Sequence, residues 1–209
     1  MSASRTIRIL AVDDHPVLRE GIVAILAGES DMAVVAEASD GREAIEQFRT
    51  HRPDITLMDL QMPVMSGSDA ILAIRREFPG ARIIVLTTYS GDAQADRAFK
   101  AGACGYLLKS MLRKELVETI RAVHAGRKRI PPEIAVELAE HHADDALTER
   151  EMDVLRQVAS GNANKIIADN LEISEETVKA HMRKILSKLG ANDRTHAVAI
   201  ALKRGIIEL

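Results

Sequence analysis

The sequence predicts two folds in succession, a doubly wound α/β domain on a parallel sheet and then a small all-α domain of four helices. Short β-branched runs alternate with longer helical patterns over residues 1–125, and these runs are largely apolar. No strand candidate follows residue 145. Strand–helix repeats followed by helices alone therefore indicate a (βα)5 sheet domain joined to a helical domain.

The first domain is predicted to contain five strands, at residues 7–12, 32–36, 55–58, 82–86 and 105–108. Their starts lie roughly 22 to 28 residues apart, which is the length of a strand, a loop and a helix. Helices are predicted at residues 16–26, 41–50, 68–78, 93–101 and 112–124. Apolar residues recur there at helical spacing, as in Ala70, Ile71 and Ile74.

Residues 126–145 interrupt this rhythm. The stretch from Gly126 to Pro132 ends in two prolines, which favours a loop that leads into a helix over residues 133–142. Residues 143–145 then form a short polar linker. We therefore expect a domain at 1–125, a linker with a helix at 126–145 and a second domain at 146–209.

The second domain contains capping residues and glycines that mark the starts and ends of four helices. Thr148 and Glu151 match a capping box, and a glycine at 161 follows the first helix. The second helix covers residues 164–171 and is expected to be capped by Asn164. Ser174 can cap a third helix that ends at residue 190, and Asn192 or Asp193 can cap a fourth that ends at residue 205.

Composition excludes several classes of protein. The chain has 209 residues, of which 46% are hydrophobic and 28% charged, unlike a disordered chain. A single cysteine, Cys104, excludes a disulfide framework and a cysteine-based zinc site. Aromatic residues make up only 2%, which disfavours stacking platforms for single-stranded nucleic acid. We expect a cytoplasmic protein without a membrane partner, because no run resembles a membrane span or a signal peptide.

Three carboxylates fall at strand ends, Asp13 and Asp14 after the first strand and Asp59 after the third. Ligands gather at the carboxyl ends of parallel strands, so these groups converge if the first and third strands are neighbours. Three such charges favour a hard cation, and Mg²⁺ is bound by a few carboxylates with water and phosphate oxygens. For Asp13 and Asp14 alone, a solvated loop is the simpler interpretation.

Two further strand ends favour a functional site over a solvated loop. Thr87 closes the fourth strand and Lys109 closes the fifth, which adds a hydroxyl donor and an ammonium to the same sheet edge. Together with the carboxylates they make a site suited to a phosphoryl group carried on an aspartate.

A resemblance to the receiver domain of two-component response regulators rests on four segments: Val12-Asp13-Asp14-His15, Leu57-Met58-Asp59-Leu60-Gln61-Met62-Pro63, Leu86-Thr87-Thr88 and Gly105-Tyr106-Leu107-Leu108-Lys109. It covers roughly residues 5–125. The resemblance implies Asp59 as the phosphoacceptor, with Thr87 and Lys109 beside it. It implies Mg²⁺ held by Asp14 and Asp59, by Asp13 more through water, and by the backbone carbonyl of Gln61.

The resemblance also implies that Thr87 and Tyr106 form a switch pair, although Tyr106 alone would be taken for a core residue. It implies a protein that is not an enzyme on other substrates, because a receiver catalyses only its own phosphoryl transfer and dephosphorylation. A phosphatase with an aspartyl-phosphate intermediate usually carries Asp-x-Asp, whereas Gln61 stands at the second position here. A P-loop nucleotidase is excluded because its glycine-rich motif is absent.

The third helix of the second domain has a basic face. Residues 177–204 contain seven Lys or Arg against one acid, whereas residues 149–176 contain three against seven. Ala180 lies at the centre of the polar face, with Lys179, Arg183 and Lys184 beside it and Lys188 nearer the boundary. A small alanine among basic residues suits entry into a DNA major groove. A solvated basic face is an equal alternative for this pattern alone.

The spacing of the second and third helices is that of a helix-turn-helix. A resemblance to the LuxR-type helix-turn-helix covers about residues 146–207 and rests on Leu147-Thr148-Glu149-Arg150-Glu151, Asn164-Lys165-Ile166-Ile167-Ala168, Ser174-Glu175-Glu176-Thr177-Val178-Lys179-Ala180-His181 and Ile185-Leu186-Ser187-Lys188-Leu189. One departure is Ile166, where the family usually has glutamate. The resemblance implies that Lys179, Ala180 and Arg183 face bases. It implies that four further residues lie nearer the DNA phosphates: Lys165, Thr177, Lys184 and Lys188.

The two halves together are similar to response regulators of the NarL/FixJ group. This implies a transcription factor that a sensor histidine kinase phosphorylates, that binds double-stranded DNA and that forms a homodimer when phosphorylated. Two other hypotheses remain: a phosphorylation-independent DNA binder with a vestigial receiver, and a signalling module that binds another protein through its first half.

Overall fold

The computed structural model describes residues 6–88, 92–132, 135 and 147–207. The chain divides into two compact units, residues 1–88 with 95–132 and residues 89–94 with 133–209. The first is called the sheet unit below and the second the helical unit. Within the described ranges, no helix is both long and apolar enough to span a bilayer.

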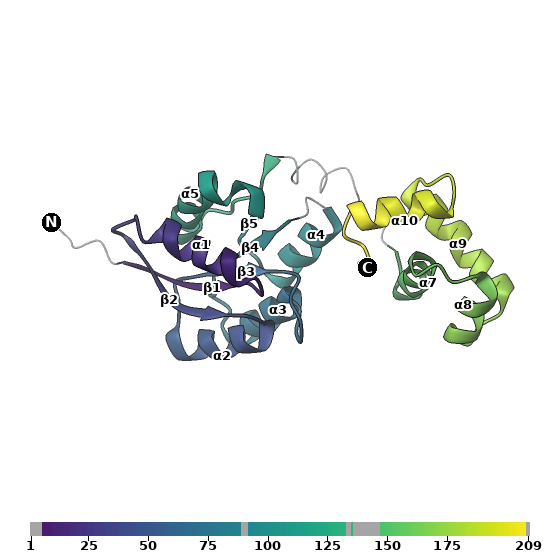
Figure 1. Cartoon of the computed structure of the whole chain (residues 1–209), viewed down its shortest axis with the longest axis horizontal. Coiled ribbons are helices and arrows are strands. Elements are labelled where there is room, and N and C mark those ends of the chain that lie inside the picture. Colours follow the sequence, from purple (N-terminus) through teal and green to yellow (C-terminus); the bar gives the residue numbers. More distant parts are fainter. Residues whose placement is uncertain (1–5, 89–91, 133–134, 136–146, 208–209) are drawn as a thin grey trace. The chain divides into compact units, whose positions relative to one another are not determined.

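The sheet unit contains five parallel strands in the order β2-β1-β3-β4-β5 (Figure 1). They are β1 (Ile7–Val12), β2 (Met32–Ala38), β3 (Ile55–Asp59), β4 (Ile83–Thr87) and β5 (Gly105–Leu108). Because strand order reverses between β1 and β3, the carboxyl ends of these two strands form the topological switch point.

Six helical segments connect and follow these strands. They are α1 (Pro16–Leu26), α2 (Gly41–His51), α3 (Gly67–Glu77), α4 (Asp92–Ala101), the 3-10 turn η1 (Lys109–Met111) and α5 (Leu112–His124). Their starts follow local chemistry, since Asp40 and Ser66 accept backbone N–H bonds at the first turns of α2 and α3. A proline at the first position of α1 needs no N–H partner.

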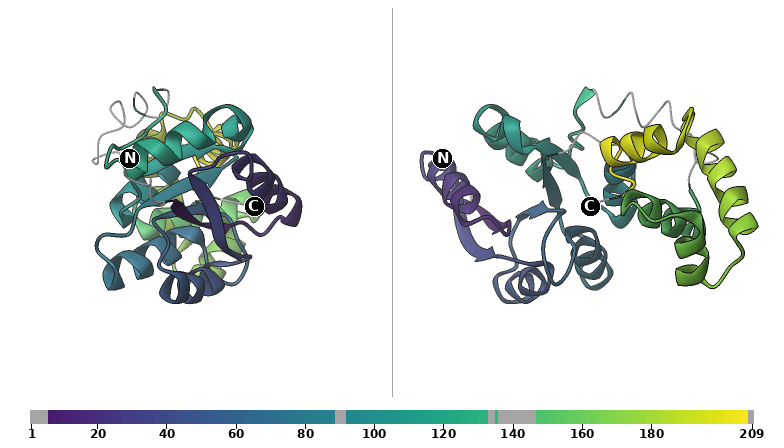
Figure 2. Two further views of the ribbon diagram at one scale, coloured as in Figure 1. Left: turned by 90° about the vertical axis from the view of Figure 1, so that its left-hand side faces the viewer. Right: turned by 45° about the vertical axis from the view of Figure 1, so that its right-hand side comes forward.

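Helices cover both faces of the sheet, with α1 and α5 on one side and α2 and α3 on the other (Figures 1 and 2). Alternate strand residues face the two sides. Ile9, Leu57, Leu86 and Leu107 form one core with the apolar residues of α1 and α5. This two-sided burial explains why most of the strands are largely apolar in the sequence.

The outer edge of β5 is covered by the chain that follows α5. The N–H of Arg129 donates to the carbonyl of Cys104 at 3.2 Å, and the N–H of Tyr106 donates to the carbonyl of Arg129 at 2.9 Å. These bonds form an isolated parallel bridge between Gly105 and Arg129. A stretch predicted as a plain loop therefore pairs with the edge strand, which leaves fewer strand groups unpaired.

The helical unit contains α7 (Glu149–Ala159), α8 (Asn164–Leu171), α9 (Glu175–Leu189) and α10 (Arg194–Lys203). The capping box of Thr148 and Glu151 begins α7 as predicted, and Ser174 and Asp193 cap α9 and α10. The prediction that Asn164 caps α8 is wrong. Ala163 holds the N-cap position and Asn164 is the first helical residue.

The predicted fold class is confirmed: a doubly wound (βα)5 parallel sheet is followed by four helices. Predicted and observed elements agree within two residues at each end. The helix predicted at 133–142 lies almost wholly outside the described residues, and the division at residues 125 and 145 stays a prediction.

Candidate functional site

Three carboxylates meet at the switch point of the sheet. Asp13 follows β1, and Asp59 is the last residue of β3, the strand that pairs with β1. Single ligand atoms of Asp13, Asp14, His15 and Asp59 all lie within 4.8 Å of one another. The expected neighbourhood of the first and third strands therefore brings the predicted acidic residues together.

Lys109 offsets part of this negative charge. Its Nζ lies 2.7 Å from Oδ2 of Asp13 and 2.9 Å from Oδ2 of Asp59. Burial alone would lower the pKa of the Lys109 ammonium, but hydrogen bonds with Asp13 and Asp59 outweigh it and raise the pKa. Lys109 therefore stays charged and holds the ends of β1, β3 and β5 together.

Asp59 keeps an excess of negative charge around it. Its side chain is buried, and this burial raises the pKa of the Asp59 carboxyl above its ordinary value against the hydrogen bond from Lys109. Repulsion from Asp13 raises the pKa further. Three carboxylates face one ammonium, so the site favours the binding of a cation.

The donor set fits a hard divalent ion such as Mg²⁺. Carboxylate oxygens of Asp13, Asp14 and Asp59 supply the hard oxygen ligands that this ion prefers. The backbone N–H of Gln61 donates to Oδ1 of Asp59 at 3.4 Å, which places the Gln61 peptide beside the cluster. His15 also lies here, with Nδ1 2.7 Å from Oδ1 of Asp14.

The loop after β3 is held in an unusual conformation. The N–H of Met65 donates to the carbonyl of Pro63 at 2.7 Å, and Val64 between them has φ +68°. This is a three-residue γ-turn with positive φ, which is costly for a β-branched residue.

A Cβ at Gly67 would lie 1.9 Å from the backbone oxygen of Asp59. Only glycine therefore allows α3 to begin this close to Asp59.

Thr87 and Tyr106 share one face of the sheet. Val85 pairs with Tyr106 across β4 and β5, and Thr87 lies two residues beyond Val85 on the same side. Both side chains are buried, and the Tyr106 ring lies 6.2 Å from that of Phe99 in α4. The predicted switch pair is thus placed on neighbouring strands beside an α4 ring.

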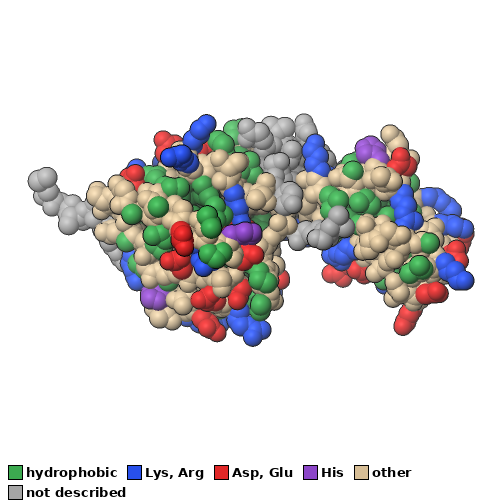
Figure 3. Space-filling model, viewed as in Figure 1, with side chains coloured by type: hydrophobic (Ala, Val, Ile, Leu, Met, Phe, Trp, Pro, Cys, Tyr) green, Lys and Arg blue, Asp and Glu red, His purple; other side chains and the backbone are tan. Residues whose placement is uncertain are grey.

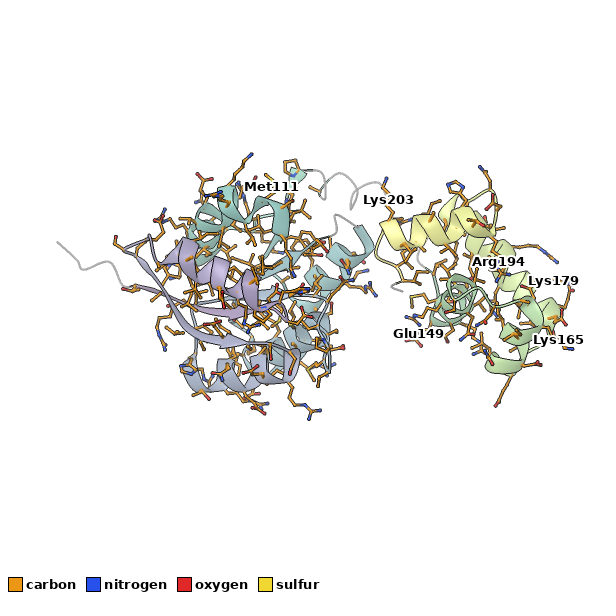
Figure 4. All side chains as sticks on the ribbon, viewed as in Figure 1. Met111, Glu149, Lys165, Lys179, Arg194 and Lys203 are labelled. Atoms are coloured by element: carbon orange, nitrogen blue, oxygen red, sulfur yellow. The ribbon has the colours of Figure 1, made fainter. Side chains whose placement is uncertain are left out.

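The polar side of α9 is exposed, as the sequence predicts. Lys179, Ala180, Arg183 and Lys184 are all exposed. Figure 3 shows Lys and Arg side chains, with Asp and Glu among them, at the outer edge of the helical unit, and Figure 4 shows Lys165 and Lys179 pointing outward from α8 and α9. Glu176 contacts two of these cations, at 3.3 Å from Arg183 and 3.5 Å from Lys179.

Side-chain bonds fix α8 between its neighbours. Arg150 of α7 donates to the carbonyl of Leu171, where α8 ends. Arg194 of α10 donates to the carbonyl of Asn162 and, at 3.2 Å, to Oδ1 of Asn164, where α8 begins. Sequence reasoning missed both arginines, because nothing in a helical pattern tells which carbonyls a distant side chain reaches.

Two predicted phosphate contacts have partners inside the unit. Oγ1 of Thr177 lies 2.8 Å from Oγ of Ser174 at the start of α9. Nζ of Lys188 lies 2.8 Å from Oε2 of Glu151 in α7. Thr177 and Lys188 thus differ from the exposed Lys165 and Lys184, for which no such contact occurs among the described residues.

Two families of known proteins match the chain. Residues 9–121 match the family described as response regulator receiver domain. Residues 145–201 match the family described as bacterial regulatory proteins, luxR family. The two matched ranges contain the acidic cluster and the exposed face of α9 respectively.

Several known proteins are similar along nearly the whole chain. The uncharacterized transcriptional regulatory protein YxjL of Bacillus subtilis (strain 168) is 38% identical over 213 residues, covering 97% of this chain and 98% of that protein. Response regulator protein VraR of Staphylococcus aureus is 38% identical over 208 residues, covering 97% of this chain and all of that protein.

Solved structures of similar fold include two regulators. RcsB of Salmonella enterica serovar Typhimurium, bound to a promoter with the phosphomimetic BeF3⁻, has a TM-score of 0.73 at 27% identity, covering 96% of this chain and 100% of RcsB. A LuxR-family two-component response regulator from an Aurantimonas species has a TM-score of 0.62 at 46% identity, covering 65% of this chain and 96% of that one.

Proposed function

Because this chain belongs to the response regulators that join a receiver domain to a LuxR-type DNA-binding domain, we propose that it is a transcriptional regulator switched by phosphorylation of Asp59. The observation that carries the assignment to Asp59 is its position. It is buried at the end of β3, at the switch point of the sheet, with the ammonium of Lys109 2.9 Å from its carboxylate. The phosphoryl donor in this proposal is a sensor histidine kinase, and the cytoplasm is the compartment that holds both.

The acceptor chemistry follows from the groups around Asp59. An Asp59 oxygen attacks the phosphorus of the donor phosphohistidine, and the bond from phosphorus to the histidine nitrogen breaks. Lys109 lies where its ammonium can pair with a phosphoryl oxygen, and the Thr87 hydroxyl can donate to another. Asp13, Asp14, Asp59 and the Gln61 carbonyl would hold Mg²⁺, which supplies charge neutralisation of the phosphoryl oxygens when bound.

The switch would run from Asp59 to the buried face shared by Thr87 and Tyr106. If the Thr87 hydroxyl turns toward a phosphoryl oxygen, the space beside Tyr106 changes, because interiors are close-packed. A repacked ring alters the surface near α4 and β5. In the proposal this favours a homodimer that presents two DNA-binding modules to two half-sites.

DNA binding would use the exposed side of α9. Lys179, Ala180 and Arg183 are proposed to face base edges in the major groove, with Lys165, Thr177 and Lys184 nearer the DNA backbone.

The test begins with selection of an operator from a random duplex pool. Arg183→Ala should then weaken the binding free energy for that operator by on the order of 1–3 kcal/mol and relax specificity at one position. Lys184→Ala should weaken all sequences alike. The reverse result would mean that α9 docks about another axis.

The acceptor is tested by mass measurement after incubation with a small-molecule phosphodonor and Mg²⁺. The parent should gain one phosphoryl group and bind the operator more tightly, and Asp59→Asn should do neither, because an amide is a poor nucleophile. Asp69→Asn, at an exposed position of α3, is the matched control and should behave as the parent. Undiminished mass gain in Asp59→Asn would assign the phosphoryl group elsewhere. Equal operator affinity with and without phosphodonor would favour the phosphorylation-independent alternative.

A further inference from the structure

Lys188 lies on α9, the helix proposed to enter the major groove, yet its ammonium contacts Glu151 of α7 inside the helical unit. We infer that Lys188 is a positioning residue that holds the C-terminal half of α9 against α7 through Glu151, and that it does not neutralise a DNA phosphate. This inference rests on the proposed DNA-binding function of α9 and changes the role expected for one of its lysines.

The geometry of the pair supports this role. Nζ of Lys188 lies 2.8 Å from Oε2 of Glu151, whose side chain is 4% exposed, whereas that of Lys188 is 26% exposed. The same Glu151 oxygen accepts the N–H of Thr148 at 2.8 Å, which closes the capping box of α7. One buried carboxylate thus joins the first turn of α7 to the last turn of α9.

The electrostatics keep Lys188 in place. Burial would raise the pKa of Glu151, but hydrogen bonds from Lys188 and Thr148 outweigh it and hold the pKa below its ordinary value. Glu151 is therefore ionised at neutral pH, and moving Lys188 to a phosphate would leave this carboxylate buried without its cation. A DNA phosphate near the pair would also be attracted only weakly, because the Glu151 carboxylate already neutralises the charge of Lys188.

The pair has a consequence for recognition. Lys188 lies one turn beyond Lys184 and Arg183 on α9, and buried Ile185 and Leu189 lie on either side of it in sequence. Val178, Met182, Ile185 and Leu189 are buried in one core and give α9 a single inward face. The ion pair adds a directed polar contact between the last turn of α9 and α7. We infer that this contact helps to hold the direction in which Lys179, Ala180 and Arg183 face.

The test compares salt dependence of operator binding by the full-length chain. Each neutralised duplex phosphate contributes about −0.9 to the slope of log affinity against log salt. Lys184→Met removes an exposed cation one turn away and should reduce the slope by about one unit. Lys188→Met keeps the aliphatic stem, so it should leave the slope of the parent while lowering affinity about fivefold to tenfold at every salt concentration. Lys188→Arg should restore the parent affinity.

A double-mutant cycle provides the second measurement. Glu151→Gln should lower operator affinity as Lys188→Met does, and the double variant should lose no more than either single one, because both remove the same contact. Amide hydrogen exchange of α9 should become faster in both single variants and stay unchanged in Lys184→Met. Exchange reports the pair without DNA, so it is informative even for a variant with weakened folding.

The outcomes separate this inference from the proposed function. A slope reduced by one unit in Lys188→Met, with α9 exchange unchanged, would overturn the positioning role while leaving DNA binding intact. Additive losses from Glu151→Gln and Lys188→Met would overturn it as well. A parent chain that binds no duplex would instead refute the proposed function, and the exchange rates would still decide whether Glu151 and Lys188 hold α9.

Discussion

Asp59 shows how a single residue can be arranged for reaction at the expense of stability. Its carboxylate is buried beside Asp13, and burial raises its pKa above the ordinary value. The stability that Asp59 contributes is fully present below its unfolded pKa of about 3.9 and is lost as pH rises through the folded pKa. At neutral pH the ionised side chain therefore destabilises the fold.

We predict that Asp59→Asn stabilises the metal-free protein at pH 7 by about 1 kcal/mol, because it removes one of three clustered negative charges. The difference between variant and parent should shrink as pH falls through the folded pKa of Asp59 and should be smallest below its unfolded pKa of about 3.9. Urea unfolding in the presence of a chelator at several pH values measures this, with Asp69→Asn as the control. A variant less stable than the parent at pH 7 would show that loss of the Lys109 contact outweighs relief of repulsion.

Gly67 is the second residue whose identity the fold dictates. Its missing side chain would otherwise meet the backbone oxygen of Asp59 at 1.9 Å. We predict that Gly67→Ala lowers the free energy of unfolding by about 2 kcal/mol and slows phosphoryl uptake, because backbone must move at the acceptor. Gly80→Ala is a matched control with nothing within 4 Å of the added Cβ. Equal stabilities of the two variants in urea would contradict the close approach.

Residues at strand ends were the predictable part of the candidate site. Asp13, Asp59, Thr87 and Lys109 each stand where an apolar run stops, and parallel strands bring such positions to one edge. The γ-turn at Val64 was not predictable, because β-branched residues avoid positive φ and the local sequence gives no sign of it. It is imposed by the surrounding loop, which must return from Asp59 to the start of α3.

At the scale of elements, the edge of β5 is the feature that pattern reasoning missed. The bridge to β5 is made by the backbone N–H and carbonyl of Arg129. Because no side chain takes part, the periodicity of side chains in the sequence gives no sign of it. The helix ends were predictable where a capping residue marks them, as at Thr148, Ser174 and Asp193. Asn164 has the right side chain for a cap, but it is the first residue within α8, and its Oδ1 accepts a hydrogen bond from Arg194 of α10 instead.

We predict that Arg129→Pro lowers the free energy of unfolding of the sheet unit by about 1 kcal/mol, because proline cannot donate to the carbonyl of Cys104. Amide exchange at Tyr106 should become faster in the same variant. Arg129→Ala keeps the backbone donor and should match the parent in both measurements. If alanine costs as much as proline, the side chain and not the bridge stabilises this edge.

At the scale of the whole molecule, the proposed function treats phosphoryl uptake and assembly as separable steps. Lys109 and Thr87 stand at the strand ends beside Asp59, the proposed acceptor, so the proposed function gives them the roles of stabilising and detecting the phosphoryl group. The sequence predicts which residues stand at this site, because each is marked locally. How a repacked Tyr106 changes assembly depends on packing across α4, which no sequence pattern encodes.

We predict that Thr87→Ala and Lys109→Ala accept some phosphoryl group yet fail to dimerise in response, because each removes a group that is proposed to contact the phosphoryl oxygens. Sedimentation with and without phosphodonor measures this, alongside the mass of each sample. Thr88→Ala alters the exposed neighbouring residue and should dimerise as the parent does. If both Thr87→Ala and Lys109→Ala still dimerise on phosphorylation, the proposed switch from Asp59 through Thr87 and Tyr106 is refuted.

The burial of Tyr106 has an optical consequence. The chain contains no tryptophan and two tyrosines, so its near-ultraviolet spectrum depends on Tyr89 and Tyr106. A phenol ring packed against Phe99 in a close-packed interior gives a near-ultraviolet circular dichroism band that disappears when the packing loosens. In a Tyr89→Phe variant, Tyr106 would be the sole tyrosine chromophore. The protein therefore contains its own spectroscopic probe of the residue proposed to switch, and repacking can be followed in real time without an attached dye.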